Sequence, residues 1–318
     1  MDDANVIIEV ENLQKRYGDF MAVNGVSFQV RKGEVFGLLG PNGAGKTTTM
    51  EMIEGLRRPD GGAARIAGFD TQKELQKVKQ VIGVQLQATS LFDLLKVKEI
   101  VRMYASFYPR SVPIEPLLDD MILSEKMGDR VKNLSGGQKQ RLAIALALVN
   151  DPLVVFLDEP TTGLDPQARR TLWDIVLRLK ERGKTIVLST HYMDEAHVLC
   201  DRICLMDKGK VIALDTPSNL VRSLQSDSAI EFRLPDEEDA PAERREHLKN
   251  VLGTIRGAKK VSVQENVWVV YTDHLQATLT DLIGKAADEG WRFADLETRT
   301  ATLEDVFIHM TGRSLREE

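Results

Sequence analysis

The chain has 318 residues, of which 42% are apolar and 28% are charged, and its formal net charge is −6. This length allows a large core and two domains, and the composition is ordinary for a soluble globular protein. The negative net charge argues against binding to nucleic acid or anionic lipid through overall electrostatic attraction. No apolar run reaches the ~18 residues that span a bilayer, and the acidic start of the chain is not typical of a signal peptide. We therefore expect a cytoplasmic protein, with any membrane span supplied by another chain.

The first strands are expected within residues 6–30, where polar and apolar side chains alternate in places, as in residues 6–10 and 25–30. Such alternation indicates half-buried antiparallel strands, so a small flanking sheet is predicted here. The next apolar run, residues 35–39, is short and continuous, as in a fully buried strand. A helix is predicted at residues 48–54.

A glycine-rich loop joins that strand to that helix and fits the pattern G-x-x-x-x-G-K-[ST]. It consists of Gly40, Pro41, Asn42, Gly43, Ala44, Gly45, Lys46, Thr47 and Thr48. Glycines let several backbone N–H groups point at one anion, and the helix N-terminus adds its dipole. In such loops the lysine contacts the β- and γ-phosphates and the threonine hydroxyl binds Mg²⁺. An incidental glycine-rich turn is the weaker explanation, because strand, loop and helix occur in the required order.

Two later apolar runs also end in residues with chemical functions. Residues 153–157 lead into Asp158 and Glu159, and residues 185–190 lead into His191. Apolar strands separated by helical stretches indicate a parallel α/β sheet. Ligands of such sheets bind outside the carboxyl ends of the strands. We therefore expect the loop, the two carboxylates and the histidine to converge on one nucleotide.

A second motif, LSGGQ at residues 134–138, opens a helical run that extends to Val149. Ser135 suits the N-cap of this helix, and Gly136 and Gly137 leave its backbone open to an anion. Taken alone, the motif is a capped helix. Its position between a phosphate loop and an Asp-Glu strand end favours a second phosphate-contacting site, which would act across two facing subunits.

Because they contain these motifs in this order, residues 4 to about 225 resemble the ATP-binding subunit of an ABC transporter. GPNGAGKTT is then the Walker A loop, LSGGQ the family signature, VVFLDEP (154–160) the Walker B strand and GLDP (163–166) the D-loop. The resemblance implies an α/β fold: a P-loop ABC ATPase domain with a parallel core sheet, an antiparallel β subdomain and a helical subdomain. We place the helical subdomain at about residues 90–150.

The resemblance also implies catalytic roles. Glu159 would orient or deprotonate the attacking water, as a carboxylate beside the γ-phosphate can. His191 would bond the γ-phosphate as the switch histidine. Gln87 matches the Q-loop glutamine, and Gln85 is a nearby competitor for that assignment.

The implied cofactors are ATP and Mg²⁺. The metal would be held by Thr47, Asp158 and Gln87. Tyr17 would stack on the adenine, and the loop residues Gly40 to Thr48 would bind the phosphates of the same subunit's nucleotide. The nucleotide of the opposite subunit would be contacted by Ser135, Gly136, Gly137 and Gln138. Asp165 would communicate across the dimer. Tyr17 could instead be an ordinary surface aromatic.

A second domain is expected at residues 227–318, after a first domain at 1–226. Its predicted strands are 229–234, 259–264, 267–272 and 291–297, and its predicted helices are 242–252, 275–289 and 302–311. A β-α-β-β-α-β order is that of a split βαβ, or ferredoxin-like, α+β unit. Residues 302–313 resemble the tail of drug-resistance ATPases that pair with a separate ABC-2 permease; they could equally form an amphipathic helix that packs on its own domain.

The expected function is that of an ATP-hydrolysing subunit that dimerises on ATP and energises a separate multi-span permease, with export favoured. The subunit would be peripheral on the inner face of the membrane, and no nucleic acid is expected as a partner. The alternative is a soluble ABC ATPase that acts on a ribosome or a DNA complex. The single phosphate loop and the lack of sustained heptads disfavour it. A P-loop kinase or regulatory nucleotide binder is disfavoured by LSGGQ.

Overall fold

The computed structural model describes residues 5–86, 91–224, 228–237, 241–264 and 266–312. The chain divides into two compact units, Met1–Pro217 and Ser218–Glu318, which we call the first and the second unit. This division lies at the start of α8 (Pro217–Arg222), whereas the boundary proposed from sequence, between residues 226 and 227, follows that helix. No helix in the described part of the chain is long and apolar enough to cross a membrane.

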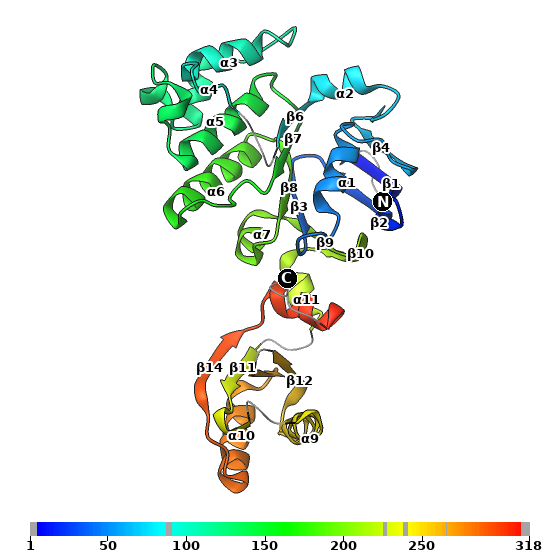
Figure 1. Cartoon of the computed structure of the whole chain (residues 1–318), viewed down its shortest axis with the longest axis vertical. Coiled ribbons are helices and arrows are strands. Elements are labelled where there is room, and N and C mark those ends of the chain that lie inside the picture. The colour runs from blue at the N-terminus through cyan, green and yellow to red at the C-terminus, as the bar shows by residue number, and fades with distance from the viewer. Residues whose placement is uncertain (1–4, 87–90, 225–227, 238–240, 265, 313–318) are drawn as a thin grey trace. The chain divides into compact units, whose positions relative to one another are not determined.

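A six-stranded sheet forms the centre of the first unit, in the order β10-β9-β3-β8-β7-β6 (Figure 1). Its strands are β3 (Val35–Leu39), β6 (Ile82–Gln85), β7 (Val154–Asp158), β8 (Thr185–Thr190), β9 (Arg202–Asp207) and β10 (Lys210–Asp215). Only the β9–β10 pair is antiparallel among the pairs of this sheet. Every residue of β3, β7 and β8 is buried, which accounts for their continuous apolar runs. Leu39 pairs with Thr190 and Asp158 with Ser189, so these three strands end side by side.

An antiparallel sheet flanks this centre, as the alternating pattern predicts. Its order is β2-β1-β4-β5, formed by β1 (Val6–Tyr17), β2 (Phe20–Arg31), β4 (Gly61–Ile66) and β5 (Phe69–Asp70). The two sheets and α1 (Lys46–Ile53) share one apolar core, in which the rings of Phe28 and Phe36 stack with centroids 5.0 Å apart. The loop before α1 therefore leads into a helix that is anchored in this core.

The helices of the first unit cover the sheet and form a separate helical part. They are α2 (Leu75–Val81), α3 (Val97–Ala105), α4 (Ile114–Asp120), the short turns η2 (Ser124–Lys126) and η3 (Val131–Asn133), α5 (Gly136–Leu148), α6 (Pro166–Glu181) and α7 (Met193–Leu199). Helices α3, α4 and α5 gather beyond the β6 edge of the sheet (Figure 1). All seven residues from Leu142 to Leu148 are buried, so the second half of α5 is the core of that part.

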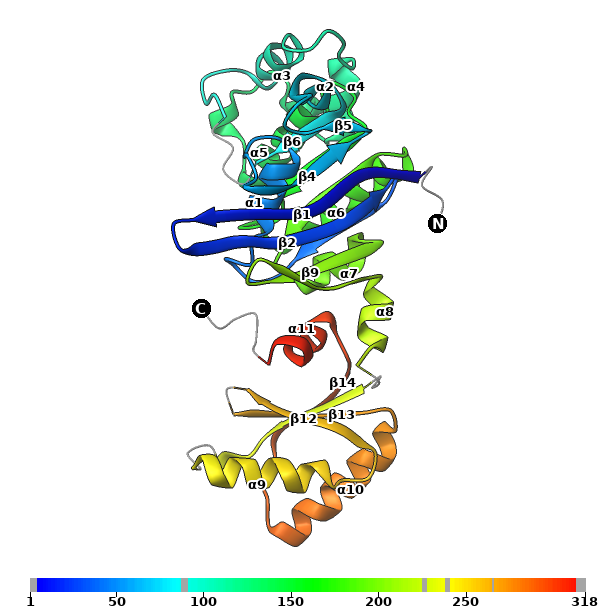
Figure 2. The same cartoon turned by 90° about the vertical axis from the view of Figure 1, so that its right-hand side faces the viewer.

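The second unit is a four-stranded antiparallel sheet in the order β12-β13-β11-β14. Its elements are β11 (Ser228–Arg233), η4 (Pro235–Glu237), α9 (Ala242–Gly253), β12 (Ala258–Gln264), β13 (Val267–Thr272), α10 (Leu275–Glu289), β14 (Ala294–Thr300) and α11 (Leu303–Thr311). Helices α9 and α10 cover one face, and α11 lies on the other (Figure 2). This is the split βαβ arrangement predicted from the order of elements.

The last strand is the element that the sequence places wrongly: it is expected at 291–297 and found at Ala294–Thr300. Helix α10 ends at Glu289, and its C-cap Gly290 has a left-handed φ of 73°. Trp291 and Phe293 then pack on the core, with the Phe293 ring 4.9 Å from that of Phe232. Pairing with β11 begins only at Ala294. The apolar pattern around Trp291 thus marks core packing before the strand starts.

Candidate nucleotide site

The glycine-rich loop lines a cavity of about 300 Å³ at the carboxyl end of β3. The lining residues are Tyr17, Phe20, Ala22, Asn42, Gly43, Ala44, Gly45, Lys46, Thr47, Thr48 and Glu159. Gly45 has a φ of 95°, and a Cβ placed on it would lie 2.5 Å from the carbonyl oxygen of Ala22. Only glycine fits there, because both the backbone angle and the space exclude a side chain.

Lys46 is the buried cation of this cavity. Its side chain is 4% exposed, and Nζ donates hydrogen bonds to the carbonyl oxygens of Gly40 at 2.7 Å and Pro41 at 3.0 Å. Nζ also lies 3.8 Å from Oε1 of Glu159. The ammonium is thus fixed at the loop, next to the carboxylate at the end of β7, where a phosphate could replace these oxygens as its partner.

Asp158 and Thr47 bring two hard oxygens together at the end of β7. Oγ1 of Thr47 donates to Oδ1 of Asp158 at 3.3 Å, and the Ser189 hydroxyl donates to the same oxygen. Burial raises the pKa of Asp158 from its ordinary value, and the two hydroxyl donors act in the opposite direction. Among the described residues no three His, Cys, Asp or Glu side chains form a metal cluster. Mg²⁺ is commonly bound by one or two protein oxygens together with substrate phosphates, and this pair fits that pattern.

Glu159 lines the cavity and has an unusual backbone conformation. Its φ is +45°, an uncommon value for a residue with a side chain. The strained position is fixed by Ser189, whose carbonyl oxygen and hydroxyl accept from the Glu159 N–H at 3.2 and 3.0 Å. Oε2 accepts from the Thr162 hydroxyl at 3.1 Å, and Oε1 lies 3.4 Å from Nδ1 of His191. Glu159 and His191 therefore meet as the strand ends predict.

Tyr17 lies at the rim of the cavity and is 42% exposed. The Arg57 guanidinium is 5.4 Å and the Lys15 ammonium 5.8 Å from its ring centroid. Phe20, 61% exposed, lines the same cavity and is not part of any motif described above. It pairs with Tyr17 across the β1–β2 turn. That short hairpin turn is the signal that could have identified Phe20.

The LSGGQ residues lie elsewhere on the chain. Ser135 caps α5: its hydroxyl accepts from the Gln138 N–H at 3.3 Å, and Oε1 of Gln138 accepts from the Ser135 N–H at 2.9 Å. None of the four residues Ser135, Gly136, Gly137 and Gln138 lines the phosphate-loop cavity of its own chain. The structure therefore brings Lys46, Asp158, Glu159 and His191 together and leaves the signature apart from them.

Two further predicted residues need separate statements. Asp165 is the N-cap of α6, and its Oδ1 accepts from the N–H groups of Gln167 and Ala168 at 3.0 and 2.9 Å. It does not line the cavity. Gln87 lies outside the described residues. Its competitor Gln85 is buried in β6, where Nε2 donates to the Leu86 carbonyl oxygen at 2.7 Å.

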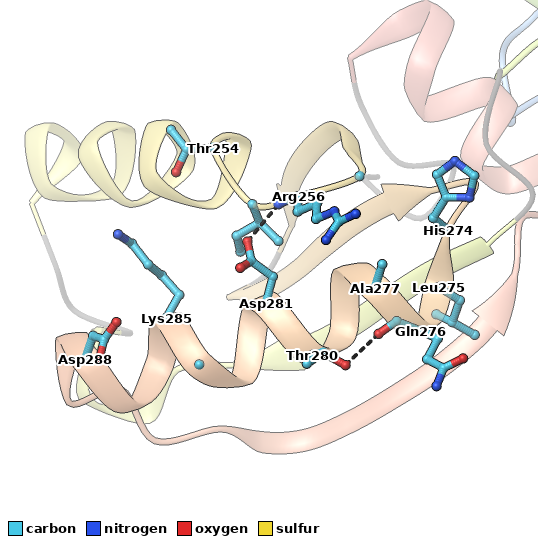
Figure 3. A pocket seen from close by; sticks show the side chains of 13 residues that line it. Thr254, Arg256, His274, Leu275, Gln276, Ala277, Thr280, Asp281, Lys285 and Asp288 are labelled. Atoms are coloured by element: carbon cyan, nitrogen blue, oxygen red, sulfur yellow. Dashed lines mark hydrogen bonds between the residues drawn. The ribbon is translucent and has the colours of Figure 1, made fainter.

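A larger hollow, about 1110 Å³, lies in the second unit between the end of α9 and one side of α10 (Figure 3). Oδ2 of Asp281 accepts from the Arg256 N–H at 2.8 Å across it. Lys285 and Asp288 line its far end on α10 (Figure 3). None of the predicted nucleotide residues lines this hollow, so size does not identify the site; the chemistry of the smaller cavity does.

Comparisons with known proteins agree with this site. A family model described as ABC transporter matches residues 23–162. The Nod factor export ATP-binding protein I of Burkholderia orbicola (strain AU 1054) is 40% identical over 98% of this chain and 98% of its own. The linearmycin resistance ATP-binding protein LnrL of Bacillus subtilis (strain 168) is 33% identical over 98% of this chain and 100% of its own.

The fold is also that of a solved cassette. The dimeric post-hydrolysis structure of the ATP-binding cassette MJ0796, bound to ADP and Pi, superposes with a TM-score of 0.60. It is 29% identical and covers 66% of this chain and 98% of that one. The relatives align over nearly the whole chain, and the solved cassette covers two thirds of it. The chain belongs to the ABC transporter family, as a subunit that binds and hydrolyses ATP.

Proposed function

We propose that two copies of the chain close on two ATP molecules and thereby drive a separate multi-span permease that exports its cargo. The observation that carries the proposal is that Lys46, Asp158, Glu159 and His191 lie close together at the phosphate-loop cavity. The signature turn, residues 135–138, does not line this cavity. A second copy would bring its Ser135 turn to the nucleotide held by the first. The relative described as a dimeric cassette supports this arrangement.

Within one site, each side chain has a distinct task. Lys46 would bind the β- and γ-phosphates as a fixed point charge, and the loop N–H groups would complete the cradle. Glu159 would orient the attacking water and accept its proton, and His191, 3.4 Å from it, would contact the γ-phosphate and hold that water in place. Ser135 and the first N–H groups of α5 would stabilise the charge of the transferring phosphoryl group from the other copy.

Mg²⁺ would be held by Thr47 and Asp158, with Gln87 as a third candidate, and would neutralise charge on the phosphates. Tyr17 would stack on the adenine base at the rim. Asp165, at the start of α6, would face the second copy. These assignments follow the motif positions, and the donor set at Thr47 and Asp158, both oxygen ligands, suits a hard cation.

The partner and the direction are inferred from the relatives. Two whole-length relatives are described as an export and a resistance ATP-binding protein, so we infer that this chain also energises export. The described residues contain no membrane-spanning helix, so the path through the bilayer would be formed by another chain, of ABC-2 type. The subunit would then sit on the inner face of the cell membrane through that permease.

The test is recovery of the chain, with an affinity tag, from detergent-solubilised membranes of cells that express it at native level. We expect a multi-span hydrophobic protein to co-purify, and reconstitution of the pair in vesicles to raise ATP hydrolysis. The matched control is the Lys46→Ala chain, which should still bind the permease but give no stimulation. Recovery with ribosomes or DNA, and without a membrane protein, would favour the soluble alternative instead.

A further inference from the structure

The first turn of α6 touches both parts of the chain that would contact ATP, and this inference rests on the proposed dimer. Asp165 caps the helix, and Ala168 lies in its first turn. A Cβ placed on Gly137 would lie only 2.9 Å from the Cβ of Ala168. The signature turn and α6 therefore meet without room for a side chain at Gly137. A displacement of the signature turn toward α6 would therefore be opposed by Ala168.

The next residue of α6, Arg169, contacts the segment after β8 that bears His191 and Tyr192. The guanidinium carbon of Arg169 lies 4.5 Å from the ring centroid of Tyr192, and that ring lies 4.1 Å from the imidazole of His191. Nε of Arg169 is buried and has no hydrogen-bond partner among the described residues. The contact with Tyr192 is thus a cation–π stack, which depends on the face of the ring and the planar guanidinium.

One turn further along, α6 holds the start of α7 as well. Nε1 of Trp173 donates to Oε1 of Glu195 at 3.1 Å, and the Glu195 side chain is fully buried. Arg169 and Trp173 are four apart on α6, so they share one face of that helix. They contact Tyr192 and Glu195, three apart on the other segment, which fixes the loop that bears His191 at two points.

We propose that the first two turns of α6 couple the two ATP-contacting surfaces of one subunit. When the signature turn engages the nucleotide of the opposite copy, Gly137 presses on Ala168. Arg169 and Tyr192 transfer that displacement to the His191 imidazole. Arg169 and Tyr192 are positioning residues: they act on the γ-phosphate only through His191.

The test compares steady-state ATP hydrolysis and nucleotide affinity in full-length variants. Arg169→Ala and Tyr192→Leu should each lower kcat about tenfold or more and leave nucleotide affinity within about twofold, because a displaced catalytic group costs turnover rather than binding. Arg169→Lys should restore part of the activity, and Tyr192→Phe most of it, since the ring is kept. The control is Arg170→Ala, an exposed arginine on the same helix.

A double-mutant cycle tests the coupling itself. Ala168→Gly removes the methyl group that meets Gly137. Gln167→Gly is its control, because it also introduces a helical glycine but leaves that contact in place. The effects of Ala168→Gly and Arg169→Ala on kcat should be non-additive, because both break one path. Additive effects, or Arg169→Ala with the kcat of Arg170→Ala, would overturn the inference. If the dimer proposal fails instead, Ser135→Arg keeps wild-type turnover, which distinguishes the two failures.

Discussion

Glu54, the residue after α1, makes the stability of the nucleotide-free first unit depend on pH. Its side chain is 3% exposed, and Oε2 has no hydrogen-bond partner in the described part of the chain. Burial, with the nearby charges of Asp158 and Glu51, raises the pKa of Glu54 from 4.5 to about 8. Above pH 4.5 the unfolded chain loses this proton, while the folded chain keeps it up to about pH 8.

The sign of the effect follows from this difference in bound protons. Between pH 4.5 and 8 the folded state binds more protons, so the free energy of unfolding falls by about 1.4 kcal/mol per pH unit as pH rises. Replacement of Glu54 by Gln keeps the shape and removes the ionisation. The variant should therefore gain about 2–3 kcal/mol over the wild type between pH 5.5 and pH 7.5.

The assay is urea unfolding of the nucleotide-free protein at several pH values, followed through the transition of the first unit. Glu115→Gln, at an exposed position on α4, is the control and should track the wild type. A constant difference between Glu54→Gln and wild type across this pH range would refute the reasoning, because it would show that Glu54 is already ionised in the folded chain.

Three further predictions test the nucleotide site and the second unit. Lys46→Ala should weaken MgATP binding about 100-fold, because the phosphates lose charge-assisted hydrogen bonds; near-normal affinity in a fluorescent-nucleotide titration would contradict the assigned role. Ser135→Arg should leave ATP binding to the monomer intact and abolish closure and hydrolysis, measured by sedimentation and phosphate release. A chain that ends at residue 226 should bind ATP like wild type but lose permease co-purification; loss of affinity in this truncation, if folded, would place the second unit at the nucleotide.

The convergence at the nucleotide site could be predicted because it depends on strand ends. Parallel buried strands end at one edge, so the residues after Leu39, Leu157 and Thr190 had to meet there. The order of the second unit was predictable for a similar reason, since the alternation of strand and helix leaves few topologies. Both are properties of short stretches of sequence.

Other parts of the site depend on contacts between distant segments and carry no local pattern. Arg57 lies beside Tyr17, and Arg169 stacks on Tyr192, only because the fold brings separate elements together. The buried carboxylate of Glu54 follows a helix whose polar and apolar residues show little periodicity. The last strand begins later than the apolar residues Trp291 and Phe293 indicate, because these two side chains pack on the core before the strand starts. Such features need the tertiary structure.

The central claim is that Glu159 activates water for hydrolysis of ATP held between two copies of the chain. The most direct measurement is ATP turnover and MgATP-dependent sedimentation of Glu159→Gln beside the wild type. The account predicts a fall in kcat of about 10²- to 10⁴-fold, the usual contribution of a positioned acid–base group. It also predicts a stable dimer in MgATP, because the two copies separate only after hydrolysis. Wild-type turnover, or a variant that stays monomeric in saturating MgATP, would contradict it.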